Sequence, residues 1–172
     1  MAYRMQPATA KATEIAMGLM SARVAKHPIH PMLVVFPLGL WVAALVFDII
    51  YAVTGQPTMR TVAFWNVGAG VIGALLAAIP GFVDWLDLTG RAARIGTYHM
   101  LLNLGAVAIF AVNWLVRTRV GADSPWPLVL SIVGVIGVAV SGWLGGELVY
   151  AHRVGVEDEE DRRAAVRQRR VA

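Results

Sequence analysis

The feature that most constrains this 172-residue chain is a series of four apolar stretches, each about as long as a membrane is thick. They cover roughly residues 31–52, 62–86, 97–116 and 126–151. A helix needs about 20 mostly apolar residues to cross a hydrocarbon core about 30 Å thick. The composition agrees with such helices, because 58% of the residues are hydrophobic and only 15% are charged. The sequence therefore predicts four membrane-spanning helices.

Short polar segments with turn residues, at 54–57 and 123–125, connect the stretches on one side. Short connections make consecutive helices antiparallel neighbours. We therefore expect an all-α fold, an integral membrane four-helix bundle with up-down-up-down topology. The chain divides into a segment 1–26 that could form an interfacial helix, a transmembrane domain 27–152, and a charged tail 153–172.

Small residues mark one face of the second stretch and one face of the fourth, for example Gly70 and Gly73 on the former and Gly142 and Gly146 on the latter. Small residues let helix backbones approach each other closely in lipid. These faces predict that the second and fourth helices pack against each other.

The basic residues are distributed unevenly about the four stretches. Twelve of the 15 Lys and Arg residues lie before the first stretch, between the second and third, or after the fourth, and the other side holds only Arg60, Arg117 and Arg119. The positive-inside rule therefore places both termini in the cytoplasm. Because the cations sit at helix ends, membrane lipid is the expected partner and nucleic acid is not. The absence of cysteine excludes disulfides, thiolate metal sites and cysteine-ligated iron–sulfur clusters.

The four histidines of the chain, His27, His30, His99 and His152, all fall at the predicted cytoplasmic end of the bundle. Asp84, near the end of the second stretch, falls at the same level. Imidazoles from facing helices can ligate haem iron, whereas histidines with a carboxylate suit zinc or non-haem iron. The alternative to both is a structural role at the membrane interface, with no ligand.

The segment 27–31, His-Pro-Ile-His-Pro, allows two local structures. A residue before proline favours an extended conformation, so the simplest expectation is a stiff turn with the helix beginning at Pro31. If Pro28 opens the helix instead, His27 and His30 share a helix face and could chelate one ion. The sequence leaves both alternatives open.

Three other polar residues of the apolar stretches receive no functional role. Asp48 is expected to pair with Arg60 or with a buried asparagine. Ser131 and Ser141 lie among glycines on the fourth stretch, where helix packing explains them.

Several segments resemble a family of bacterial membrane proteins known as domain of unknown function 2231, which implies a multi-pass protein of the bacterial inner membrane. The resemblance covers roughly residues 25–156 and is carried by residues 27–39, 81–85 and 141–150, together with His99 and Asn103. It implies redox chemistry, because some relatives look fused to Rieske-type or cytochrome-like modules and the bundle is similar to two-haem cytochrome b folds. Many relatives carry a further histidine where this chain has Val35, which implies a single haem here, with His30 and His99 as the ligand pair.

These observations lead to three hypotheses. The first is a redox protein that binds one b-type haem through His30 and His99, has His27 and Asp84 beside it, and passes electrons between a quinone-like carrier and a protein partner. The second is a non-haem zinc or iron site formed by the same four residues. The third is an accessory or structural subunit without a cofactor, and a homo-oligomer is compatible with all three. The sequence identifies no catalytic nucleophile and does not decide whether the protein is an enzyme.

Overall fold

Four long helices form almost all of the described chain. The computed structural model describes residues 23–24 and 27–156. The helices are α2 (Ile29–Thr54), α3 (Pro57–Leu86), α4 (Gly90–Arg117) and α5 (Trp126–Tyr150). Each is long and apolar enough to cross a membrane, which confirms the prediction of a four-helix membrane bundle.

Two short strands precede the bundle. They are β1 (Arg23–Val24) and β2 (His27–Pro28), which pair antiparallel with Val24 opposite His27. The rest of the expected N-terminal helix and the tail from residue 157 lie outside the described residues.

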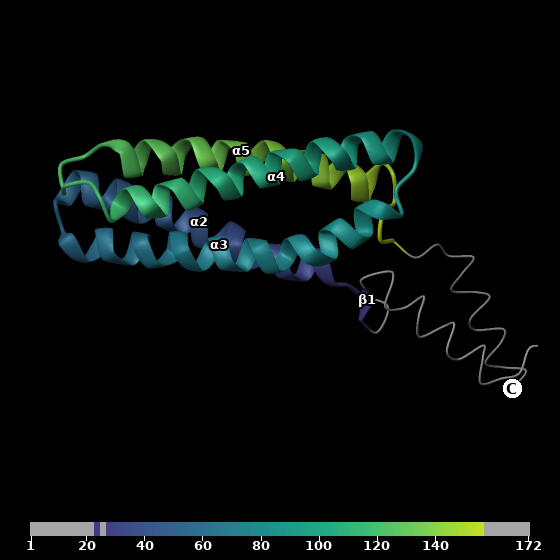
Figure 1. The fold of residues 1–172 in the computed structure, drawn as a ribbon, viewed down its shortest axis with the longest axis horizontal. Coiled ribbons are helices and arrows are strands. Elements are labelled where there is room, and N and C mark those ends of the chain that lie inside the picture. The colour runs from purple at the N-terminus through teal and green to yellow at the C-terminus, as the bar shows by residue number, and fades with distance from the viewer. Residues whose placement is uncertain (1–22, 25–26, 157–172) are drawn as a thin grey trace, which may run out of the picture.

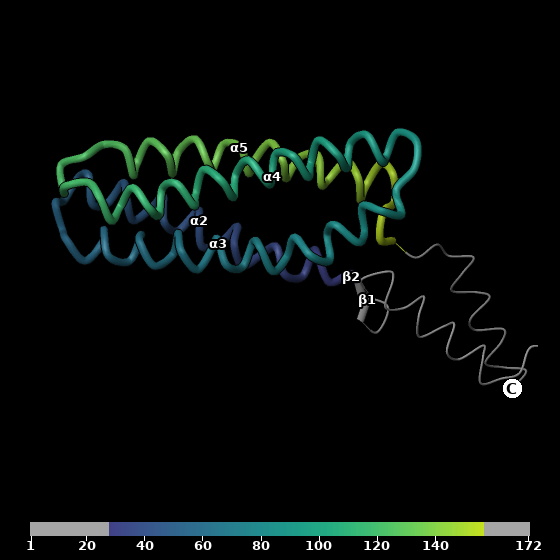
Figure 2. The backbone as a smooth tube through the Cα atoms, viewed as in Figure 1, coloured from purple at the N-terminus to yellow at the C-terminus, as the bar shows by residue number. Residues whose placement is uncertain are grey.

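The helices form two antiparallel hairpins, α2–α3 and α4–α5, which lie side by side (Figure 1). The contacts within each hairpin are more extensive than those between the hairpins, where α3 meets α4 and α2 meets α5. The backbone trace in Figure 2 shows that both hairpins turn at the same end of the bundle, while the α3–α4 connection lies at the other. We call the end where α2 begins and α5 finishes the proximal end, and the end with the two hairpin turns the distal end.

Two helix starts differ from the expected ones. Helix α2 begins at Ile29, with Pro28 as an extended N-cap residue, rather than at Pro31. A proline is tolerated in the first turn because the N–H groups there need no partner within the helix. His30 is therefore helical while His27 belongs to β2, so the two do not share a helix face. Helix α4 begins at Gly90 rather than near residue 97, which places His99 about 2.5 turns inside the helix.

Large side chains of α2 and α4 fill the space left by glycines of α3 and α5. A Cβ atom on Gly70 would overlap the Trp41 indole, and one on Gly134 would lie 2.6 Å from the Phe110 ring. The faces of α3 and α5 that carry Gly70 and Gly134 therefore pack on α2 and α4, within the hairpins, whereas nothing lies within 4 Å of a Cβ on Gly142 or Gly146. The expectation that α3 and α5 pack against each other is wrong, because these helices lie diagonally across the bundle.

The two hairpins repeat one packing pattern. Three contacts cross the middle of the bundle at the same separation in sequence: His30 with His99, Trp41 with Phe110, and Asp48 with Arg117. Their glycine neighbours on α3 and α5 also recur, as Gly70 and Gly134 do, and residues 70–73 and 134–137 share the sequence Gly-Val-Ile-Gly. Equivalent residues thus meet along the bundle centre, as they do about a two-fold axis parallel to the helices.

Candidate functional site

The proximal site consists of His30 on α2 and His99 on α4. Their rings meet across the bundle with centroids 6.3 Å apart and planes at 89°. Both side chains are half-buried. The two histidines thus reach a common level from different hairpins, as the alternating helix directions predicted.

His30 is held against α3. Its Nδ1 atom lies 2.8 Å from the carbonyl oxygen of Ala77. The ring occupies the space beside Gly81, where an added Cβ would come within 2.6 Å of Nδ1. Because a carbonyl oxygen can only accept a hydrogen bond, Nδ1 carries the proton and donates. The neutral ring then has its lone pair on Nε2.

His99 is held against α5 in the same way. Its Nδ1 donates to the carbonyl oxygen of Ser141 at 2.8 Å, and the Ser141 hydroxyl lies 3.1 Å from the same atom. That hydroxyl also donates to the His99 carbonyl oxygen at 3.3 Å. Ser141 therefore positions His99, and the expectation that this serine serves only helix packing is wrong.

The second nitrogen of His99 also has a partner in the structure. The Asn103 side-chain amide donates to Nε2 at 2.9 Å, one turn further along α4. The equivalent position of α2, one turn beyond His30, is Val34, which offers no such donor. The two imidazoles are therefore anchored alike through Nδ1 but differ at Nε2.

This anchoring is the arrangement that prepares histidines for metal binding. Metal-ligating imidazoles almost always donate one N–H to a carbonyl or carboxylate, which fixes the tautomer and leaves the other nitrogen for the metal. The arrangement also satisfies the polar ring atoms without any ligand, because helix carbonyls serve as their partners.

The remaining candidate residues are Asp84, His27 and His152. Among the residues that the structure describes, no three His, Asp or Glu side chains form a group that could hold a metal ion. Asp84 is half-buried on α3, one turn beyond Gly81, and His152 follows the end of α5. The side chain of His27 lies outside the described part of the chain.

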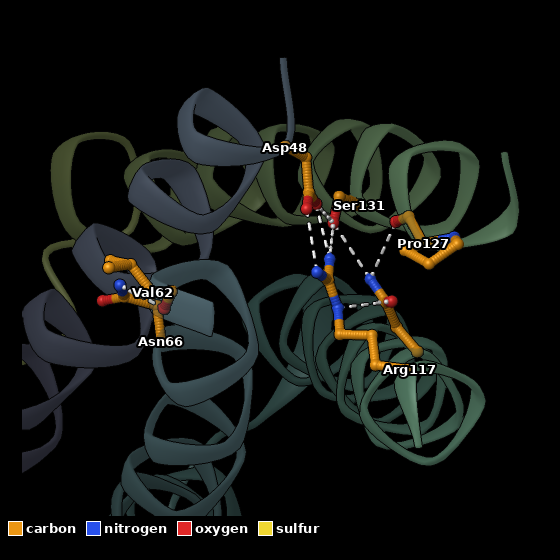
Figure 3. A network of polar contacts seen from close by, with 7 residues as sticks. Asp48, Val62, Asn66, Arg117, Pro127 and Ser131 are labelled. Atoms are coloured by element: carbon orange, nitrogen blue, oxygen red, sulfur yellow. Dashed lines mark hydrogen bonds and ion pairs between the residues drawn. The ribbon is translucent and has the colours of Figure 1, made fainter. Parts of the chain in front are cut away.

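A second polar cluster, which the sequence did not reveal, lies at the distal end (Figure 3). The Arg117 guanidinium donates through Nη1 to Asp48 at 2.8 Å and makes a second bond from Nη2 to the other carboxylate oxygen. Asp48 was expected to pair with Arg60 or an asparagine. It pairs with Arg117 instead, while Arg60 donates to the carbonyl oxygen of Val120 at 2.8 Å.

Ser131 and Asn113 complete this cluster. The Ser131 hydroxyl donates to Asp48 and accepts from both Arg117 and Asn113. Asn113 also accepts from Arg117 Nε at 3.0 Å and donates to the Pro127 carbonyl oxygen. All four side chains are buried. A buried ion pair is stable only when its remaining hydrogen-bonding capacity is satisfied, and here the serine and asparagine satisfy it.

One sequence signal could have found this cluster. The interval from His30 to Asp48 equals the interval from His99 to Arg117. If the histidines meet, an equal rise along two parallel helices brings the aspartate and the arginine together. Between the two polar clusters, Trp41 stacks on Phe110 with ring centroids 4.2 Å apart, so an apolar layer separates them.

Comparison with known proteins gives one match. Residues 26–158 match the model of the family described as "Predicted membrane protein (DUF2231)". No curated protein and no solved structure matches the chain. The match covers most of the chain, including both polar clusters and all four membrane-spanning helices. This multi-pass membrane protein therefore belongs to the DUF2231 family.

Proposed function

We propose that this protein is a membrane redox protein in which His30 and His99 bind the iron of one b-type haem. The observation that carries the proposal is the meeting of two imidazoles from different hairpins within the membrane-spanning helices. Histidine is a common axial ligand of haem iron, and bundle cores are a common place for such sites.

The separation of the rings supports a shared ion. Because a metal–imidazole bond is about 2.0 Å long, two imidazoles that share one ion would have ring centroids roughly 6 Å apart. The observed separation is 6.3 Å. The donor set also fits haem, since the macrocycle supplies four nitrogens and requires only two from the protein.

The chain's own residues have defined tasks in this proposal. The carbonyl oxygens of Ala77 and Ser141 hold both Nδ1–H groups, so that both Nε2 atoms serve as ligands. Asn103 donates to Nε2 of His99, so this hydrogen bond would have to break for that nitrogen to hold iron. Haem would supply one-electron redox chemistry. The distribution of basic residues predicts that this end faces the cytoplasm, where a quinone in the inner leaflet or a redox protein would exchange electrons.

The test is an absorption spectrum of the full-length protein purified from membranes of its native host. We expect a Soret band that shifts on reduction with dithionite, and about one haem per chain by pyridine haemochrome analysis. His30→Ala and His99→Ala should each remove the band. His152→Ala is the matched control, because this histidine lies at the same end but outside the pair, and it should keep the band.

The opposite results would reject the proposal. A folded, colourless protein without iron would favour an accessory subunit with no cofactor. Stoichiometric zinc or non-haem iron, lost in His30→Ala and in His27→Ala, would favour the second hypothesis. If the Soret band is weakened to the same extent in His30→Ala, His99→Ala and the control His152→Ala, the haem is bound elsewhere.

A further inference from the structure

An open pocket of about 390 Å³ lies at the distal end, between the two hairpins. Its lining includes Tyr51 and Arg60 from the first hairpin and Arg117, Asp123, Ser124 and Leu128 from the second. The volume falls in the range of small-ligand sites.

Two hydrogen bonds fix the wall of the pocket. Arg60 donates to the carbonyl oxygen of Val120, and the Tyr51 hydroxyl donates to the carbonyl oxygen of Ala122 at 3.2 Å. Both bonds tie the α4–α5 connection of the second hairpin to helices of the first. The pocket is therefore held by contacts between distant parts of the chain.

The charges of the lining fall into two groups. Asp48 and Arg117, which are buried, neutralise each other and are satisfied by Ser131 and Asn113. Arg60 and Asp123 form no ion pair with each other or with any other residue in the described part of the chain. Arg60 is half-buried and uses one guanidinium N–H on Val120, which leaves the other donors available.

One unpaired cation and one unpaired anion in the same pocket are complementary to a zwitterion. We propose that the distal pocket binds a phosphoethanolamine group, with its phosphate on Arg60 and its ammonium on Asp123. Arginine suits phosphate because its planar fork donates two parallel hydrogen bonds. An ammonium group supplies donors that a carboxylate accepts.

Two sources offer this chemistry. Trp65 and Trp126 are exposed near this end, and such rings favour the headgroup level of a bilayer. The headgroup of phosphatidylethanolamine would then lie at the depth of the pocket. The other source is a water-soluble diester such as glycerophosphoethanolamine, which would enter from the aqueous side.

Native mass spectrometry of the full-length protein tests the lipid source. The protein is released from micelles that contain phosphatidylethanolamine, phosphatidylglycerol or phosphatidylcholine in turn. We expect retention of phosphatidylethanolamine over the other two, because phosphatidylglycerol lacks the ammonium and the choline group has no N–H to donate. The soluble source is tested by calorimetric titration with glycerophosphoethanolamine.

Matched variants assign the binding to the pocket. Arg60→Gln and Asp123→Asn should each weaken binding about tenfold or more, the effect of losing one charge-assisted hydrogen bond. Arg60→Lys keeps the positive charge and should therefore retain part of the binding that Arg60→Gln loses. Arg119→Gln and Asp87→Asn are the controls, since both residues are exposed and neither lines the pocket.

The results decide the proposal in either direction. A preference for phosphatidylethanolamine that only the pocket variants lose supports the lipid source, and binding of the soluble diester lost in the same variants supports the aqueous source. Binding of neither compound overturns the proposal. Equal losses in pocket and control variants overturn it as well.

Discussion

At the distal end of the bundle, Asp48 and Arg117 join the two hairpins through hydrogen bonds, whereas at the proximal end His30 and His99 each bond within their own hairpin. The positions are equivalent, since the two pairs have the same separation in sequence. The distal pair holds the hairpins together, while the proximal pair links them only by a contact between rings. Separating the hairpins at the proximal end would break neither histidine's hydrogen bonds. Inserting a ligand between His30 and His99 therefore costs less free energy than inserting one between Asp48 and Arg117, where hydrogen bonds between the hairpins would have to break.

The largest effect is expected from breaking the distal ion pair. Asp48→Ala or Arg117→Ala leaves one charge buried without its partner, which typically destabilises a protein by about 3–5 kcal/mol. The double variant Asp48→Leu with Arg117→Met removes both charges and should recover most of that loss. The measurement is the free energy of unfolding in mixed micelles, with exposed Arg119→Ala as the control.

A charge exchange sharpens the same comparison. Asp48→Arg combined with Arg117→Asp should be more stable than either single change, because the two positions face each other across the axis. If the double exchange is as unstable as the single variants, the orientation set by Ser131 and Asn113 matters more than the pairing itself.

Glycine substitutions test whether the two hairpins are packed alike. Gly70→Ala brings a methyl group against Trp41, and Gly134→Ala brings one within 2.6 Å of Phe110. Overpacking of this kind costs about 1–3 kcal/mol. Gly39→Ala and Gly137→Ala are the controls, since nothing lies within 4 Å of a Cβ at either position. The controls should be neutral or slightly stabilising, because alanine favours the helix by about 1 kcal/mol over glycine. Loss of stability in the controls as well would contradict the packing described here.

The sequence predicted what depends on length and direction along the membrane normal. The four spans followed from apolar length, and the common level of His30 and His99 followed from alternating helix directions, whereas their choice as a pair was implied by the family resemblance. The helix starts were misjudged because helices extend beyond the hydrocarbon core into polar residues, as α4 does at Gly90. The length of an apolar stretch gives no information about polar residues that continue the helix outside the membrane.

What depends on the lateral arrangement of helices was not predicted. The faces of α3 and α5 were assigned to each other because small residues indicate close packing without naming the partner. Arg117 was interpreted as a cation at the membrane surface, since charge counting treats every arginine at a helix end alike. The internal repeat, visible in the equal His–Asp and His–Arg spacings, carries the information that single-helix patterns lack.

The smallest effect is expected from a substitution that gives Nε2 of His99 the same surroundings as Nε2 of His30. Asn103→Val places at position 103 the residue type found at the equivalent Val34, and it removes the hydrogen bond to Nε2 of His99. A neutral hydrogen bond is worth about 0.5–1.5 kcal/mol, so haem binding should tighten severalfold if Asn103 competes with iron for that nitrogen. The measurement is a titration of haem into the unloaded protein, followed by the Soret absorbance. Asn66→Val is the control, because among the described residues Asn66 donates to the Val62 carbonyl of its own helix and to no residue of the proximal pair (Figure 3). Weaker binding in Asn103→Val but not in the control would mean that the asparagine supports the site, and that the asymmetry between the two histidines belongs to its function.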